Sequence, residues 1–435
     1  MLNKLLQLRN HQGFLKYLKN TSWMMGEQLI RILAGLFVGI WVARYLGPEQ
    51  FGIFSYALAF TAIFAGIAKL GLDGIMVREL INHPEKRDVY LGTAFWLKVI
   101  SAFFVMGLMA VIVPFTSNDT TTNIFIFIIA TGLVFQSFEV VEFYFQSQVL
   151  AKIVSICKVT QLALSSMIKI YLVITGADLV WFVLVTAFDA ISLAISFFIA
   201  YKIRKNPAFY KHFDFSIAKQ LLSDSWPLIF SSVVVMIYMR IDQVMIKEML
   251  GEYEVGIYSS AVRLSEVFYF IPTLATASLF PAILNAKNQS EILYKKRLSR
   301  LYTFMVWLAI FIALPMTFLS NWLIVMLYGV VFEEAYKVLT IHIWASIFVF
   351  LGVASGRWFL VENLQRYTLI NTSVGAILNV ILNIIFISKF GVIGAAYATI
   401  ISYGVAAYFM NCIWSLTRSN FFMLSKSLLL FRNLS

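Results

Sequence analysis

The strongest constraint on the fold of this sequence is a succession of apolar segments, each long enough to cross a membrane as a helix. A membrane-spanning helix needs about 20 mostly apolar residues. Only 13% of the residues are charged, against about 25% in a soluble domain. This share excludes a soluble enzyme, a disordered chain and a secreted disulfide scaffold. We therefore predict an all-α integral membrane protein with twelve transmembrane helices. The predicted spans are 21–45, 50–68, 91–114, 122–149, 153–175, 179–201, 225–249, 255–284, 301–327, 335–361, 368–388 and 392–416.

The distribution of basic residues predicts which side of the membrane each loop faces. The formal net charge is +12, and most of the Lys and Arg outside the spans fall in alternate loops, beginning with the N-terminal segment. Loops rich in Lys and Arg stay on the cytoplasmic side. We therefore expect both termini in the cytoplasm and the protein in the bacterial inner membrane. The positive charge is then explained without nucleic acid as a partner. The few basic residues predicted outside are Arg44, Lys247, Lys337 and Lys389.

Several other features are excluded by local signals. Residues 1–20 are polar and basic and precede a long apolar run, so we interpret them as a cytoplasmic tail and not as a cleaved signal. Cys157 and Cys412 lie inside apolar segments, and their positions predict no metal site. The chain has no P-loop pattern of Gly, four residues and Gly-Lys-Ser/Thr. We therefore expect no nucleotide as direct driver and no cofactor.

The sequence also repeats itself at an offset of about half its length. Residues 46–57 and 250–261 are identical at half of their positions, and the pair Ser22-Trp23 recurs as Ser225-Trp226. This offset contains six predicted helices, an even number, so the two halves have the same orientation. Such a parallel repeat has its axis along the membrane normal. The predicted parts are an N-terminal lobe of six helices (21–201), a cytoplasmic linker (202–224), a C-terminal lobe of six helices (225–416) and a cytoplasmic tail (417–435).

The repeated segment predicts a tight hairpin outside the membrane. Gly47 can adopt the positive φ that ends a helix, and Pro48 suits the first turn of the next helix. Glu49 then lies at the positive end of that helix dipole.

This hairpin carries a resemblance to a known family. The segment ARYLGPEQFG (43–52) resembles the first hairpin of the Wzx-type polysaccharide flippases, which belong to the multidrug/oligosaccharidyl-lipid/polysaccharide (MOP) exporter superfamily. The segments LGLD (70–73), VREL (77–80) and GIYSSA (256–261) are similar to later parts of the same pattern. The resemblance implies two lobes around a central cavity. It also implies export of undecaprenyl-pyrophosphate-linked oligosaccharide, such as an O-antigen or capsule repeat unit, with polymerase and chain-length proteins of the same pathway as partners.

Charged residues inside the predicted spans of the first half indicate a polar interior, because each costs free energy in lipid. Arg31 lies near mid-membrane, four residues after Glu27, which can neutralise it. Lys158 and Lys169 share one helical face with Gln161 and Ser165, and that face has no acid. An anion-binding cavity is one interpretation of the two lysines. Snorkelling of their side chains to the membrane surface is the other.

In the second half, Arg240 and Asp242 point to nearly opposite sides of their helix, so one of them is expected to meet a neighbouring helix. Arg263 and Glu266 are three residues apart, and self-pairing is one interpretation of them. We expect a pyrophosphate group to meet Arg31, Lys169 and Arg263, with Lys158 and Arg240 as further substrate-binding candidates.

Coupling of transport to an ion gradient requires a carboxylate whose charge changes during the cycle. Asp189, Glu139 and Asp242 are the candidates, because each lies deep in a predicted span. Asp189 has no opposite charge within one turn of its own helix, so we predict it as a proton-responsive residue. The alternative is that Asp189 bonds a basic residue of another span. The polar face of Gln136, Glu139, Glu142 and Gln146 can likewise pair with the basic face of the following span.

Two other functions remain open at this point. A cation-coupled multidrug exporter of the same fold requires an acidic, aromatic cavity, and the intramembrane cations argue against it. An O-antigen polymerase-type enzyme usually requires a large outside loop, whereas the predicted outside loops are short. We therefore predict a flippase and not an enzyme.

Overall fold

The computed structural model describes residues 12–428, and within them all regular structure is helical. Eleven helical segments of the described residues are long and apolar enough to cross a membrane. The first of them contains a break at Gly47, where φ is 72° and the helix changes direction, so it supplies two spans. The all-helical membrane fold and the twelve predicted spans are therefore confirmed.

The chain forms two compact units. The first unit contains the described residues up to Val42 together with Ala57–Val233, and the second contains Ala43–Tyr56 together with the described residues from Val234 onwards. The first unit thus holds most of α2 (Gln12–Ala68) and the first half of α9 (Phe215–Leu250). The hairpin around Gly47 groups with the second unit.

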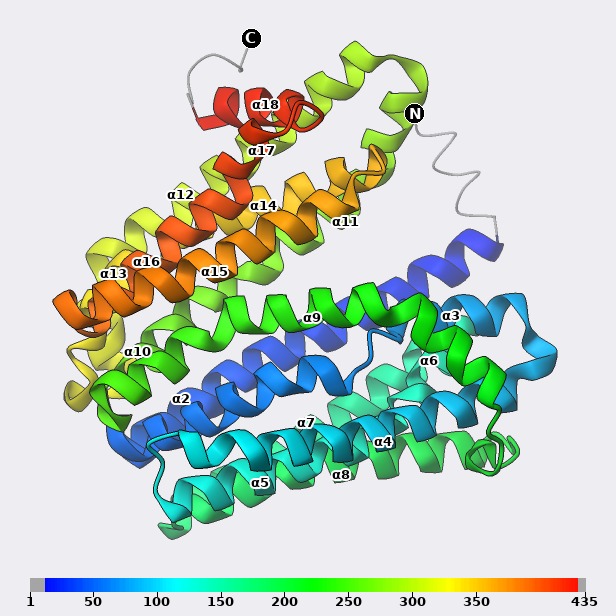
Figure 1. Cartoon of the computed structure of the whole chain (residues 1–435), viewed down its shortest axis with the longest axis horizontal. Helices are drawn as coiled ribbons and strands as arrows, with labels where there is room; N and C mark the ends of the chain where they lie inside the picture. The colour runs from blue at the N-terminus through cyan, green and yellow to red at the C-terminus, as the bar shows by residue number, and fades with distance from the viewer. Residues whose placement is uncertain (1–11, 429–435) are drawn as a thin grey trace. The chain divides into compact units, whose positions relative to one another are not determined.

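In the first unit, α7 and α5 both pack against α8, and α3 packs against α6 (Figure 1). A buried core around Leu91, Phe145 and Phe209 joins α3, α4, α6, α8 and η4. The remaining elements of this unit are α3 (Asp73–Asn82), η1 (Pro84–Lys86), α4 (Arg87–Ile112), η2 (Val113–Phe115), α5 (Thr120–Phe135), η3 (Gln136–Glu139), α6 (Val140–Ser147), α7 (Ala151–Thr175), α8 (Leu179–Ile203) and η4 (Phe209–Lys211).

In the second unit, α15 packs along α16, and α12 packs against α11, α13, α14 and α18 (Figure 1). A second buried core around Tyr302, Phe350 and Leu424 joins α11, α12, α14 and α18. The elements are α10 (Glu252–Glu266), η5 (Val267–Tyr269), α11 (Phe270–Gln289), α12 (Glu291–Tyr328), η6 (Val330–Phe332), α13 (Ala335–His342), α14 (Ala345–Val361), α15 (Gln365–Phe390), α16 (Val392–Gly404), η7 (Val405–Phe409), α17 (Met410–Ile413) and α18 (Arg418–Leu428).

The two hairpins of the repeat have the same backbone conformation and contact each other. Gly47 has φ 72° and ψ 172°, and Gly251, 204 positions later, has φ 103° and ψ 180°. A Cβ atom on Gly52 would lie 1.8 Å from the carbonyl oxygen of Glu252, and one on Gly256 would lie 1.9 Å from that of Pro48. At the offset of 204, Pro48 corresponds to Glu252 and Gly52 corresponds to Gly256. The contact is thus reciprocal, because the glycine of each hairpin approaches the residue four positions earlier in the other hairpin. Glycine is required at both positions for the backbones to approach this closely.

Three features of the helices were not predicted from the sequence. The segment predicted as a C-terminal tail contains the helix α18, and helix α2 begins inside the segment predicted as an N-terminal tail. The fourth predicted span is interrupted by the 3₁₀ turn η3, which contains Glu139. A 3₁₀ segment within a longer helix often marks a strained or functional position.

Candidate functional site

Three ion pairs connect neighbouring helices inside the first unit, and we call them the first polar cluster. Lys169 on α7 donates to an Asp189 oxygen on α8 at 2.9 Å, and Lys158 on α7 donates to Glu142 on α6 at 2.6 Å. Lys98 on α4 donates to Glu139 in η3 at 2.8 Å. Every basic side chain in this cluster therefore has a carboxylate partner on another helix.

Asp189 bonds a basic residue of another helix, which was the alternative to an unpaired carboxylate in the sequence analysis. Gln161 donates to one carboxylate oxygen at 2.9 Å, and Lys169 donates to the other at 2.9 Å. The polar face of α7 has no acid of its own, but α6 and α8 supply acids to it. Both lysines of this face therefore form ion pairs with acids of neighbouring helices. Lys169 and Asp189 are each about one quarter exposed.

Arg31 is the most accessible of the predicted basic residues in the first unit. Its guanidinium lies 3.2 Å from Glu27, which confirms the pairing along α2, while half of its side chain remains exposed. A cavity of about 610 Å³ next to this pair is lined by Trp23, Glu27 and Ile30 of α2 and by Ile156 and Thr160 of α7.

In the second unit, Arg240 and Asp242 meet different neighbours, as their positions on opposite sides of α9 predict. Both terminal nitrogens of Arg240 donate to one oxygen of Glu266 at 3.3 Å. The carboxylate of Glu266 therefore contacts Arg240 on another helix. The ion pair across the two helices, from α9 to α10, involves Arg240 and Glu266. The side chain of Arg263 is half-buried next to this pair.

Asp242 is the centre of a second polar cluster that contains only neutral partners. Tyr258 and Thr399 donate to one of its oxygens, and Asn383 donates to the other, each at 2.6 Å. Within the described residues no Lys, Arg or His forms an ion pair with this buried carboxylate. Asn379 accepts a bond from Asn383, whose own side-chain oxygen is buried and has no partner among the described residues. The cluster thus combines a buried negative charge with an available acceptor.

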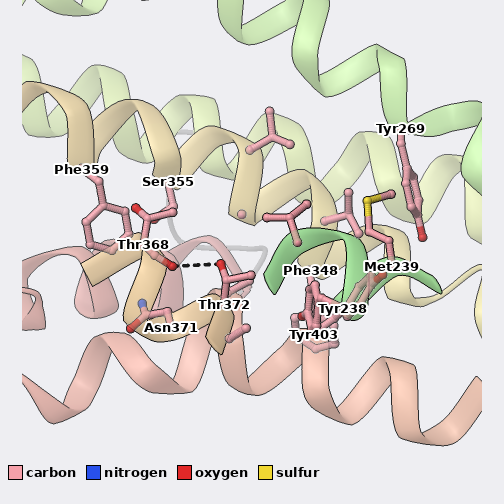
Figure 2. A pocket seen from close by; sticks show the side chains of 16 residues that line it. Tyr238, Met239, Tyr269, Phe348, Ser355, Phe359, Thr368, Asn371, Thr372 and Tyr403 are labelled. Atoms are coloured by element: carbon pink, nitrogen blue, oxygen red, sulfur yellow. Dashed lines mark hydrogen bonds between the residues drawn. The ribbon is translucent and has the colours of Figure 1, made fainter. Parts of the chain in front are cut away.

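A cavity of about 260 Å³ lies one helical turn from Asp242 (Figure 2). Tyr238 and Tyr403 stack at one end with ring centroids 4.4 Å apart, and each is four residues from a member of the second polar cluster. At the other end, the side-chain oxygen of Asn371 is buried without a partner in the described part of the chain. None of the lining residues is acidic. The π-helical turn η7 borders this cavity, and such turns are frequent at functional sites.

Sequence reasoning did not identify every polar residue in these clusters. Lys98 lies in an otherwise apolar predicted span, and its charge alone was a sufficient signal. Tyr258 and Thr399 gave no signal, because a Thr hydroxyl in a helix commonly bonds its own backbone and a single Tyr predicts no particular partner. Asn383 was not among the predicted site residues. No group of three or more potential metal-ligating His, Cys, Asp or Glu side chains occurs in the described residues.

Two family models match this chain. The model described as polysaccharide biosynthesis protein matches residues 17–287, more than half of the chain, and the model described as MatE matches residues 227–385. The chain is 26% identical to the probable low-salt glycan biosynthesis flippase Agl15 of Haloferax volcanii, over 86% of this chain and 78% of that protein. It is 23% identical to the capsular polysaccharide biosynthesis protein CapF of Staphylococcus aureus, over 89% of this chain and 96% of that protein.

Two solved structures show the same fold. The lipid II flippase MurJ in an inward closed conformation superposes with a TM-score of 0.71 at 17% identity, over 94% of this chain and 91% of that chain. A multidrug resistance MATE family transporter in an inward-facing conformation superposes with a TM-score of 0.70 at 17% identity, over 91% of this chain and 96% of that chain.

The fold and the family models together define a multi-pass helical membrane protein that matches the polysaccharide biosynthesis protein model and, over a shorter segment, the MatE model. The chain belongs to the polysaccharide biosynthesis protein family. The family prediction based on the first hairpin is confirmed.

Proposed function

We propose that this protein moves undecaprenyl-pyrophosphate-linked oligosaccharide from the cytoplasmic to the periplasmic leaflet by alternating access. The family and the names of the flippase relatives support a glycan attached to a lipid carrier. The observation that carries the proposal is the pairing of Lys169 with Asp189, because a pyrophosphate oxygen can replace the carboxylate oxygen at the same ammonium group. Lys158 and Arg31 are held by single carboxylates in the same way.

This exchange gives Asp189 a defined part in the transport cycle. A pyrophosphate at Lys169 places negative charge beside Asp189, and the two anions repel each other. Protonation of Asp189 removes this repulsion and releases the lysine for the substrate. Loss of the proton restores the ion pair and expels the phosphate. In this proposal the proton-responsive role of Asp189 uses its pairing with Lys169, and it does not require an unpaired carboxylate.

Asp242 is the second coupling residue in this proposal. Its oxygens meet only neutral donors, and the side-chain oxygen of Asn383 remains available beside them. A proton or a monovalent cation bound there would neutralise the buried charge. Glu139, the third coupling candidate, forms an ion pair with the almost fully buried Lys98.

The substrate site is tested by export of surface polysaccharide in cells that depend on this protein. Lys169→Ala should lower export about tenfold or more at equal protein level, because one charge-assisted hydrogen bond contributes about 1.5–3 kcal/mol. Asp189→Asn should bind the lipid-linked substrate at least as tightly as the wild type but release it slowly. The matched control is Lys152→Ala, an exposed lysine at the start of α7. Equal export by Lys169→Ala and Lys152→Ala would refute the site.

Coupling is tested in vesicles under imposed proton or sodium gradients. Asp189→Asn should abolish the proton dependence of transport, and Asp242→Asn should abolish the dependence on whichever ion occupies the second polar cluster. Wild-type transport that ignores both gradients would rule out coupling at either residue.

A cation-coupled multidrug exporter is the second candidate function. The MatE model matches part of the second unit, and the aromatic cavity of Figure 2 lies there. This cavity has no acidic residue among its lining side chains, whereas a cationic drug requires negative charge. Increased resistance to cationic dyes on expression, together with unchanged polysaccharide export, would favour the exporter.

The proposed location is the inner membrane, with both termini in the cytoplasm and with polymerase and chain-length proteins as partners. Reporter fusions at Asn118 and Glu333 should then report the periplasm, and a fusion at Asn288 should report the cytoplasm. A cytoplasmic signal at Asn118 would overturn this topology.

A further inference from the structure

A basic pocket lies between the beginning of α12 and the helix α18, inside the second unit. Its volume is about 360 Å³. Four cationic side chains line it, three from α12 and one from α18, together with a hydroxyl and an aromatic ring from α18. These residues are Lys295, Lys296, Arg300, Lys426, Ser419 and Phe422.

The pocket has rigid walls because α18 is fixed to the unit by buried contacts. Tyr302 on α12 donates to the Asn420 side-chain oxygen at 2.8 Å, and the Asn420 amide donates to Ser355 at 2.6 Å. Leu424 is fully buried in the same core. Ser419, Phe422 and Lys426 are spaced along a different face of the helix, and that face lines the pocket.

The positive charge in the pocket is poorly compensated within the protein. Lys295 lies 3.4 Å from Glu291, but no ion pair within the described residues involves Lys296 or Arg300. The pocket therefore contains two cationic groups, Lys296 and Arg300, that form no ion pair within the described residues and are able to bind an anion.

Apolar side chains next to the basic groups indicate what kind of anion fits. Phe422 is exposed at the pocket, and Trp414 and Leu416 are exposed just before α18. A combination of Lys and Arg with exposed aromatic and aliphatic side chains at a helix end is typical of the membrane interface, where the charges meet phosphate groups and the apolar groups meet acyl chains. A soluble anion alone would leave these apolar groups in water.

We propose that this pocket binds the phosphate headgroup of an anionic phospholipid. Lys296 and Arg300, one turn apart on α12, hold the phosphodiester, and Lys426 adds the contact from α18. Phe422 packs against the upper part of an acyl chain. By the predicted orientation the pocket faces the cytoplasmic leaflet. The site is separate from the first polar cluster and from the second, so it does not depend on the identity of the transported glycan.

Native mass spectrometry of the full chain, purified in detergent, tests this proposal. The probes are phosphatidylglycerol, phosphatidylcholine and inorganic phosphate. The wild type should retain one phosphatidylglycerol in preference to phosphatidylcholine, and excess inorganic phosphate should not displace it. Lys296→Ala/Arg300→Ala should weaken this binding about thirtyfold, roughly what two basic contacts contribute at a membrane surface.

Two controls separate a pocket from general surface charge and from misfolding. Arg204→Ala/Lys211→Ala removes the same charges from exposed positions in the predicted linker and should leave binding unchanged. Lys296→Arg/Arg300→Lys keeps the charge and should keep most of the binding. Equal loss in the linker variant, displacement by inorganic phosphate alone, or equal binding of phosphatidylcholine would each overturn the proposal.

Discussion

The contact between the two hairpins provides the sharpest structural test, because at Gly52 and Gly256 it leaves room for a hydrogen atom but not for a methyl group. In Gly52→Ala the new Cβ would lie 1.8 Å from the Glu252 carbonyl oxygen, whereas ordinary contacts begin at 3.4 Å. The backbones must therefore separate by about 1.6 Å, since neither atom belongs to a side chain that can rotate away.

The energetic cost of this separation can be estimated. Forcing an extra methyl group into a well-packed contact costs about 1–3 kcal/mol. The gain from replacing glycine by alanine within a helix, about 0.5–1 kcal/mol, offsets only part of it. We expect the melting temperature of Gly52→Ala in detergent to fall by a few degrees. The matched control Gly107→Ala, in α4, places its methyl group where no atom lies within 4 Å and should be neutral or stabilising.

The reciprocal geometry adds a second requirement. Gly256→Ala meets the Pro48 carbonyl oxygen at 1.9 Å and should cost about as much as Gly52→Ala. One separation of the hairpins relieves both overlaps, so the double variant should cost clearly less than the sum of the two, as is common for residues in contact. The reasoning would be refuted if Gly52→Ala melted at or above the temperature of Gly107→Ala, or if the double variant were strictly additive.

Two further predictions concern charged groups of the first unit. Glu139→Gln leaves the almost fully buried Lys98 without its partner and should destabilise the protein by about 3–5 kcal/mol. In detergent unfolding, the double variant Lys98→Met/Glu139→Gln should recover most of this lost stability. A double variant that is no more stable than Glu139→Gln would contradict the pairing. Asp119 accepts a hydrogen bond from the Thr122 N–H at the start of α5, and hydrogen bonding by the Thr122 side chain, with a smaller effect of this N–H bond, lowers the pKa of Asp119. The contribution of ionised Asp119 to the stability of the protein is therefore present at neutral pH. This contribution is lost as the pH falls below about 4 and through the lowered pKa of Asp119 in the folded state. Asp119→Asn should keep the cap and remove this pH dependence, whereas Asp119→Ala should cost up to about 1 kcal/mol; identical acid sensitivity in the wild type and Asp119→Asn would disprove it.

The sequence determined the spans, their number and the internal repeat. A helix in lipid must satisfy its own backbone hydrogen bonds, so length and apolar composition identify it without knowledge of its neighbours. The break at Gly47 and its counterpart at Gly251 were local signals of the same kind. The family followed from the residues of that hairpin.

Only the tertiary structure decided which charges meet. The periodicity of α7 placed Lys158 and Lys169 on one face, but it contained no information on which acid a neighbouring helix turns toward that face. Glu142 and Asp189 were each visible in the sequence, and their assignment depends on the rotation of α6 and α8 about their axes. The same limit applies to Glu266. Arg263 lies on the same helix as Glu266, and the sequence did not indicate that Arg240 of α9 forms an ion pair with it.

The pocket at α18 shows this limit most clearly. The basic residues of α12 and of the C-terminal segment were visible in the sequence, but nothing local indicated that Asn420 anchors a helix against Tyr302. A local pattern fixes what a segment presents on its own surface. The packing of two segments, which depends on many side chains distant in sequence, decides what that surface encloses.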